Sequence, residues 1–216
     1  SPILRLLPNG LIDGSFVPTT LPVGIINRVQ PIGNGQTLAM GNFAIFNNGL
    51  VAVDVAVYQN DGSVDEAFSD RFSGKVTSCM PSQNGGYWIA GNNIRFDGSA
   101  PARLYRLTAD FELDPSFQAP ADLNCRGNCQ FVLAEQADGR LLVGGPVVMG
   151  TDSSLLRLLP NGDLDASFQL DAPLYREDSW INGRPDDTEL LDNGDILVVG
   201  GFTRMGDTPL RGMLRL

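Results

Sequence analysis

Residues 156–168 read LRLLPNGDLDASF, and related stretches recur along the chain. The copies end about 50 residues apart, at Phe16, Phe68, Phe117 and Phe168. Three residues before each phenylalanine stands an aspartate: Asp13, Asp65, Asp114 and Asp165. Residues 212–216 begin a partial fifth copy. A fixed period of this length indicates a repeat architecture, so residues 1–216 are predicted to form a single repeat domain.

A second motif alternates with the first and consists of a turn pair followed by an apolar run, as in NGDILVVGGF at residues 193–202. Asn-Gly and Asp-Gly pairs between apolar runs indicate hairpins, because the mirror-image turns need a positive φ at their central residues. In the second unit we expect strands A, B, C and D over residues 27–32, 36–43, 50–58 and 63–68. Their short connections predict an antiparallel meander.

A lone meander exposes an apolar face, and stacking the units around an axis buries that face. The chain is therefore predicted to be all-β, with about four four-stranded blades of a β-propeller, either alone or as part of a larger one. A β-sandwich would explain the strands but not their repetition. We expect no helix longer than about two turns, since the turn spacing leaves no room for one.

The block R-L-x-x-(N/D)-G-x-(L/V)-D-x-S-F, alternating with (N/D)-G-x-(L/I)-L-V-x-G-G-F, resembles the delta-60 repeat, a bacterial repeat of propeller type in large secreted or surface proteins. The match is best at residues 156–168 and 193–202. It is weaker in the second unit, where Val57 replaces the arginine and Ala67 the serine. The resemblance implies a β-propeller and an extracellular setting, and it implies no activity.

Composition argues against several classes of function. The net charge is −10 and Lys75 is the only lysine, so no basic face is expected for nucleic acid. The absence of histidine excludes Ser-His-Asp and Cys-His catalytic units and histidine-ligated zinc. No apolar run reaches the roughly 20 residues that a membrane helix needs. We expect no membrane insertion, no metal and no cofactor.

The three cysteines are Cys79, Cys125 and Cys129. Cys125 and Cys129 lie four positions apart with a glycine between them. This spacing permits a disulfide that leaves Cys79 free, but it does not require one. Three reduced, mostly buried thiols are the other interpretation.

The aspartate column is expected to be structural. An aspartate two residues before a serine suits an Asx-type turn, in which the carboxylate accepts a bond from the backbone two residues on. Binding of calcium or a ligand is the alternative. The arginine column is a candidate partner for these aspartates, although Val57 occupies that column where Asp65 remains. Trp88 falls in an apolar column of strand B and is predicted to be buried.

The D–A connections are longest in the last two units, where the insertions are residues 119–130 and 172–187. In a meander, D–A and B–C connections emerge on one face, so both insertions should lie on that face. Functional residues concentrate in such loops. The candidate ligand-binding residues are therefore Tyr175, Arg176, Trp180 and Arg184, for a sugar ring or a protein partner. Trp180 is expected to be more exposed than Trp88.

The predicted function is a non-catalytic recognition or scaffold module of a bacterial protein, outside the cell or at its surface. A carbohydrate-binding propeller is the first alternative. The second is a polysaccharide-active enzyme that uses acidic residues such as Glu177 and Asp178. In a closed ring of four blades, residues 2–7 and 212–216 would compete for one strand C position. We therefore expect self-association or continuation into neighbouring blades.

Overall fold

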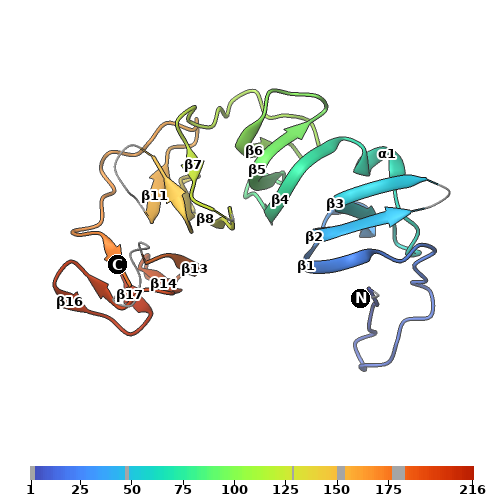
Figure 1. Cartoon of the computed structure of the whole chain (residues 1–216), viewed down its shortest axis with the longest axis horizontal. Helices are drawn as coiled ribbons and strands as arrows, with labels where there is room; N and C mark the ends of the chain where they lie inside the picture. The colour runs from blue at the N-terminus through green and yellow to red at the C-terminus, as the bar shows by residue number, and fades with distance from the viewer. Residues whose placement is uncertain (1–2, 47–48, 128, 150–153, 177–182) are drawn as a thin grey trace.

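The computed structural model describes residues 3–46, 49–127, 129–149, 154–176 and 183–216. In these residues, the repeat units contribute four three-stranded antiparallel sheets that follow one another along an open arch, with the chain ends on opposite arms (Figure 1), and two smaller sheets lie in the connections of the last two units. Strands account for 46% and helices for 4%, which confirms the all-β, propeller-like class. The described helices are short: η1, a 3-10 turn (Gly33–Gly35), and α1 (Glu66–Ser69).

Each of the four sheets along the arch, called a blade here, contains strands A, B and C of one unit, with strand B in the middle. The first blade contains β1 (Val23–Pro31), β2 (Thr37–Phe46) and β3 (Leu50–Tyr58). The second contains β4 (Phe72–Pro81), β5 (Tyr87–Phe96) and β6 (Ala102–Leu107). The third contains β8 (Val132–Glu135), β9 (Leu141–Gly144) and β11 (Leu155–Leu158). The fourth contains β13 (Pro185–Leu190), β14 (Ile196–Gly200) and β17 (Met213–Arg215).

Two small ribbons join the D–A and B–C connections in the last two blades. In the third blade, β7 (Asn124–Cys125) pairs with β10 (Val147–Val148). In the fourth, β12 (Leu174–Tyr175) pairs with β15 (Arg204–Met205), which also pairs with β16 (Thr208–Pro209). These pairings place the D–A and B–C connections of a blade at the same end, as the meander predicts.

The prediction of a strand D is wrong. Residues 63–68 contain a single bridge, from Tyr58 to Val64, and then enter α1. The equivalent bridges join Leu6 to Ile12, Leu107 to Leu113 and Leu158 to Leu164. The chain leaves the sheet after one bridge because a turn follows at once. In that turn the Phe117 N–H donates to the Asp114 carbonyl at 3.2 Å, and the backbone bends away from the ladder.

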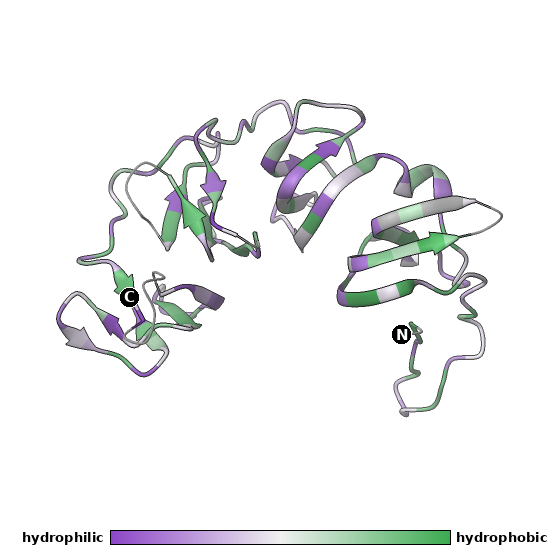
Figure 2. Cartoon of the chain, in the orientation of Figure 1, coloured by the Kyte–Doolittle hydropathy of each residue, from purple (hydrophilic) through white to green (hydrophobic). Residues whose placement is uncertain are grey.

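The core lies between successive blades, because each sheet is apolar on both faces; Figure 2 shows apolar residues along the strands of every blade. On β5, Tyr87 and Ile89 pack against the first blade, whereas Trp88 and Ala90 pack against the third. Trp88 is fully buried, which confirms the expectation from its column. Every inner sheet therefore needs a neighbour on each side.

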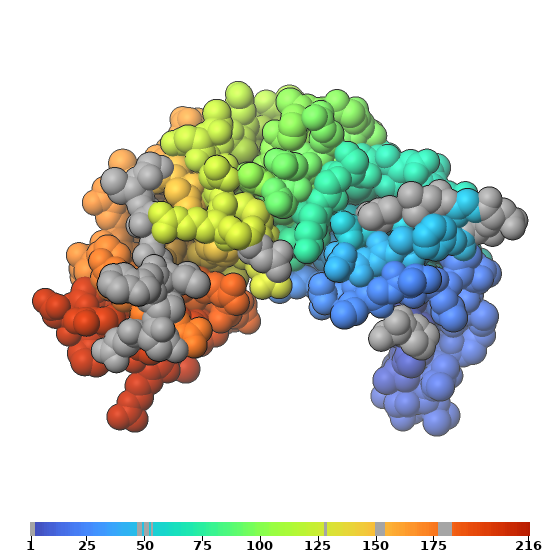
Figure 3. Space-filling view, in the orientation of Figure 1, coloured from blue at the N-terminus to red at the C-terminus, as the bar shows by residue number. Residues whose placement is uncertain are grey.

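The N-terminal unit covers the outer face of the first blade. Phe16 packs there with Phe43, Ile45 and Tyr58, and the rings of Phe16 and Tyr58 are 6.3 Å apart. Strand C of the fourth blade is supplied by β17, so the N-terminal segment does not enter that sheet. The two arms of the arch remain apart in the space-filling view (Figure 3).

C–D turns dock on the linker that leaves the previous unit. The Val17 N–H, directly after Phe16, donates to the Asp61 carbonyl at 2.8 Å. The Gln118 N–H, directly after Phe117, donates to the Asn161 carbonyl at 3.0 Å. Gly162 lies against this linker with a φ of 101°, and a Cβ there would lie 2.0 Å from the Gln118 carbonyl oxygen. The docking therefore requires glycine at this turn.

Replacing Gly162 with alanine should destabilise the fold strongly, because a backbone clash adds to the cost of a positive φ, about 1–2 kcal/mol. Gly98→Ala is the matched control, since Gly98 has a φ of 70° but open space around its Cβ position. Thermal unfolding followed by circular dichroism should show a clearly larger fall in Tm for Gly162→Ala. Equal falls for the two variants would contradict the tight docking of this turn.

Candidate functional site

Three of the four repeat units contain the same side-chain cluster, called the repeat latch here. In the unit of Phe117, Arg106 Nε donates to Asp114 Oδ2 at 2.7 Å. The Ser116 N–H and hydroxyl both donate to Asp114 Oδ1, at 2.9 and 2.6 Å. The Arg106 guanidinium carbon lies 5.5 Å from the Phe117 ring centroid. The same contacts recur in two further sets: Arg5, Asp13, Ser15 and Phe16, and Arg157, Asp165, Ser167 and Phe168.

The unit of Phe68 lacks the arginine and the serine, and its aspartate has other partners. Asp65 caps α1 by accepting a bond from the Phe68 N–H at 3.0 Å, and it accepts another from Gln59 Nε2 at 2.7 Å. Ser69, at the end of α1, accepts a bond from the Val57 N–H at 3.1 Å. The helix α1 therefore covers the outer edge of strand C in the first blade.

The latch aspartates are held in the ionised form by donors from the chain itself. Bonds from Ser15, and then from Arg5, lower the pKa of Asp13 to about 2. The Ser167 hydroxyl, with further bonds from the Ser167 N–H and Arg157, lowers the pKa of Asp165 to about 2 against an opposing effect of burial. These oxygens are occupied by the fold, which supports a structural role for them.

The latch predicts a loss of stability in acid. The folded-state pKa of about 2 lies below the usual 3.8, so stability is present above that range and is lost as the pH falls from about 4 to about 2. Asp13→Asn combined with Asp165→Asn should flatten this loss while lowering stability at neutral pH. Urea midpoints at neutral pH and at pH about 2.5 measure it, with the exposed Asp192→Asn as control. An unchanged acid loss in the double variant would contradict the assignment.

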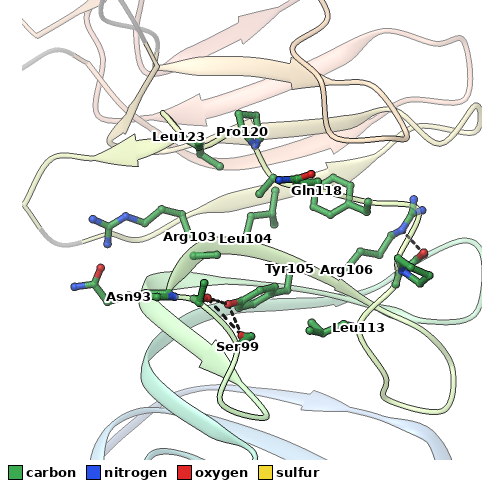
Figure 4. A pocket seen from close by; sticks show the side chains of 18 of the residues that line it. Asn93, Ser99, Arg103, Leu104, Tyr105, Arg106, Leu113, Gln118, Pro120 and Leu123 are labelled. Atoms are coloured by element: carbon green, nitrogen blue, oxygen red, sulfur yellow. Dashed lines mark hydrogen bonds and ion pairs between the residues drawn. The ribbon is translucent and has the colours of Figure 1, made fainter.

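A groove of about 690 Å³ lies beside β6, the strand C of the second blade (Figure 4). One wall is β6 itself, with Arg103, Leu104 and Tyr105; the other is the linker of residues 117–124, which leads to the third blade. Because the chain leaves the sheet near Asp114, the groove occupies the place where a fourth strand would pair.

Arg103 and Tyr105 are held on this wall by different polar contacts. The Arg103 guanidinium donates to the side-chain amide oxygens of Asn92 and Asn124, the second at 2.9 Å. Asn124 belongs to the D–A insertion, so Arg103 ties that insertion to the second blade. The Tyr105 hydroxyl lies 2.7 Å from the Ser99 hydroxyl, which holds the B–C connection in place.

The predicted ligand residues do not line this groove. Tyr175 and Arg176 line a separate shallow hollow of about 480 Å³, together with Arg204 and Asp207. The Tyr175 side chain is 41% exposed. The residues that border this hollow come from the D–A and B–C connections of the fourth blade.

Arg184 lines neither the groove beside β6 nor the hollow beside Tyr175, and its Nε donates to Asp186 at 3.0 Å. Trp180 lies outside the described residues, as do Glu177 and Asp178. The expectation that Trp180 is more exposed than Trp88 therefore stays a prediction, and so does its role in ligand binding.

Cys125 and Cys129 are joined in a disulfide, which closes the insertion of the third blade. Cys79 is free and buried on β4, and burial raises the pKa of its thiol to about 12. A thiol this hard to ionise is a poor nucleophile at neutral pH. In the part of the chain that the structure describes, no three His, Cys, Asp or Glu side chains gather where they could hold a metal ion. None of the described helices is long and apolar enough to span a membrane.

Residues 136–168 match the model of a family described as a domain of unknown function (DUF5122) beta-propeller. The matched segment contains β9, β11 and the latch of Phe168. This chain carries a repeat of the β-propeller type. No curated protein matches the chain. The family match therefore supports the blade architecture and leaves the function to be argued from the site.

The sequence did not predict the groove because Arg103 and Tyr105 lie on strand C, where the repeat pattern indicates residues of the core and of the latch. The groove exists only because strand D is missing beside β6. One signal was available: Pro115 follows Asp114 directly, and proline cannot donate to a strand ladder. That signal predicts the end of the strand, but not the course of the linker that forms the opposite wall.

Proposed function

We propose that this chain is a non-catalytic recognition module that binds a protein partner in the groove beside β6. The observation that carries the proposal is the groove of about 690 Å³ beside an uncovered strand edge. Its lining combines accessible apolar side chains such as Leu113 and Ala121 with the ring of Tyr105 and the guanidinium of Arg103. Ligand sites are concave and combine apolar surface with placed polar groups, and this groove offers both kinds of surface in similar amounts.

The ionisable groups favour binding over catalysis. A general acid works best with its pKa raised toward the working pH. The resolved carboxylate shifts in the described residues all lower the pKa: Asp13, Asp61, Asp97, Asp114, Asp138, Asp165 and Asp195. The free thiol of Cys79 is shifted away from its reactive form by burial.

The proposed setting is the exterior or the surface of a bacterial cell. Disulfides persist in oxidising compartments, and the bond between Cys125 and Cys129 fits such a compartment. The resemblance of the repeat to delta-60 repeats supports the same setting. The net charge of −10 argues against a nucleic-acid partner, because phosphates need a basic face.

A library of random twelve-residue peptides displayed on phage tests this function. We expect enrichment of peptides on the purified protein, and loss of their binding in Ala121→Trp, which fills the groove from the exposed side of its linker. Ala67→Trp, at an exposed alanine of α1, is the matched control and should bind normally. Failure to enrich any groove-dependent peptide would count against the proposal. So would release of reducing ends from polysaccharides that Glu177→Gln or Asp178→Asn abolishes.

One observation favours carbohydrate binding as a second function. The hollow of about 480 Å³ beside Tyr175 offers an exposed aromatic ring with Arg204 and Asp207 around it. An aromatic face suits a sugar ring, and flanking charged groups suit its hydroxyls. Binding on a glycan array that Tyr175→Ala removes and Ala121→Trp leaves intact would establish this function. A Tyr175→Ala variant with undiminished glycan binding would exclude the hollow as the site.

A further inference from the structure

The outer edge of β6 carries backbone groups without partners. The Asp114 N–H donates to the Arg106 carbonyl at 2.9 Å, so Arg106 directs its backbone groups away from β5. Alternate residues of a strand direct these groups to the same side, so Leu104 does so as well. Among the described residues, none bonds across this edge to the Arg106 N–H or to the N–H and carbonyl of Leu104. Leu104 and Arg106 both line the groove.

The first blade shows how the chain covers such an edge when it does so itself. Val57 stands there at the repeat position of Arg106, and its N–H donates to the Ser69 hydroxyl at 3.1 Å. Ser69 belongs to α1, which follows the turn of that unit. In the second blade, the chain that follows the equivalent turn is the linker of residues 117–124. This linker forms the opposite wall of the groove. The two units of this chain therefore differ in the edge of strand C, which α1 covers in the first blade and which faces the groove in the second.

Arg103 brings a positive charge to the same groove. Many arginines of the described residues pair with carboxylates, among them Arg5, Arg71, Arg106, Arg140, Arg157, Arg184, Arg204 and Arg215. Arg103 is oriented instead by the neutral amide oxygens of Asn92 and Asn124. A guanidinium has five N–H donors, so donors remain after these two bonds. Carboxylates are the strongest protein acceptors for them.

We propose that the groove binds an extended segment of a partner protein as a fourth strand on β6, with a carboxylate of that segment bonded to Arg103. This inference rests on the recognition function proposed above. In strand addition, main-chain bonds supply affinity and side-chain contacts supply specificity. Leu113, which lines the groove and is 39% exposed, offers an apolar contact. The six residues of β6 span about 20 Å, which matches a segment of about six residues.

The probes for a direct test are nine-residue peptides of alternating threonine and valine, with blocked ends. A single glutamate occupies each position in turn, and each peptide has a glutamine twin. Binding is measured by isothermal titration calorimetry. At one or two positions we expect the glutamate peptide to bind about tenfold more tightly than its twin, because a charge-assisted bond to Arg103 is lost in the twin.

Backbone methylation of the tightest peptide tests strand addition itself. Only every second residue of an added strand directs its N–H toward the edge of β6. N-methylation at the positions whose N–H faces β6 should therefore abolish binding. Methylation at the positions between them should leave binding largely intact. An equal effect of methylation at the two sets of positions would overturn the proposal.

Substitutions in the protein test the carboxylate contact. Arg103→Gln should remove the preference for glutamate and bring the affinity down to that of the glutamine twin, whereas Arg103→Lys should keep part of the preference. Arg211→Gln, at an exposed arginine of the fourth blade, is the matched control and should change nothing. Thermal unfolding of each variant shows whether the fold is kept. An undiminished preference for glutamate in a folded Arg103→Gln protein would overturn the proposal.

The failure of this inference is distinguishable from the failure of the proposed function. If library peptides bind in a groove-dependent manner but methylation has the same effect at both alternating sets of positions, strand addition is wrong and peptide recognition stands. If neither the library peptides nor any member of the alternating series binds, both proposals fail.

Discussion

Burial on both faces of each inner sheet is the constraint on which this arch depends. A sheet of three short strands is marginally stable by itself, and neighbouring repeats supply what it lacks. On β5, Trp88 and Ile89 are adjacent in sequence but pack against different blades, so a single strand contributes to two interfaces. Polar contacts set the spacing between blades, as where the Thr77 hydroxyl donates to the Cys129 carbonyl at 2.6 Å.

The repeat latch links this stacking to the site. Its Asp-x-Ser turn satisfies the aspartate with local donors and places the phenylalanine beneath the arginine. In every unit, with or without the latch, the chain leaves the sheet after a single bridge at this turn. The edge of strand C then needs another cover. The helix α1 supplies that cover in the first blade through Ser69. Beside β6 the linker passes at a distance and leaves a groove, so the candidate site follows from an incomplete repeat unit.

Two arginines on β6 differ in role because they bond to different partners. Arg106 pairs with Asp114 and packs near Phe117, so its charge is used within the fold. Arg103, three positions earlier, is held by two neutral amides, which orient the guanidinium without neutralising it. The first arrangement stabilises a turn, whereas the second leaves a charge available to a ligand.

The sequence by itself determined the repeat, the all-β class, the burial of Trp88 and the turn at each Asp-x-Ser, because these follow from residues a few positions apart and from a period that repeats them. It did not determine strand D, since residues 63–68 suit either a strand or a turn. Only the tertiary structure decided the groove and the place of Arg103, whose partners Asn92 and Asn124 lie on another strand and in another unit. It also decided that β17 completes the fourth blade and that the arms stay apart. Such outcomes depend on packing between segments far apart in the chain, and local pattern carries no information about the distances between them.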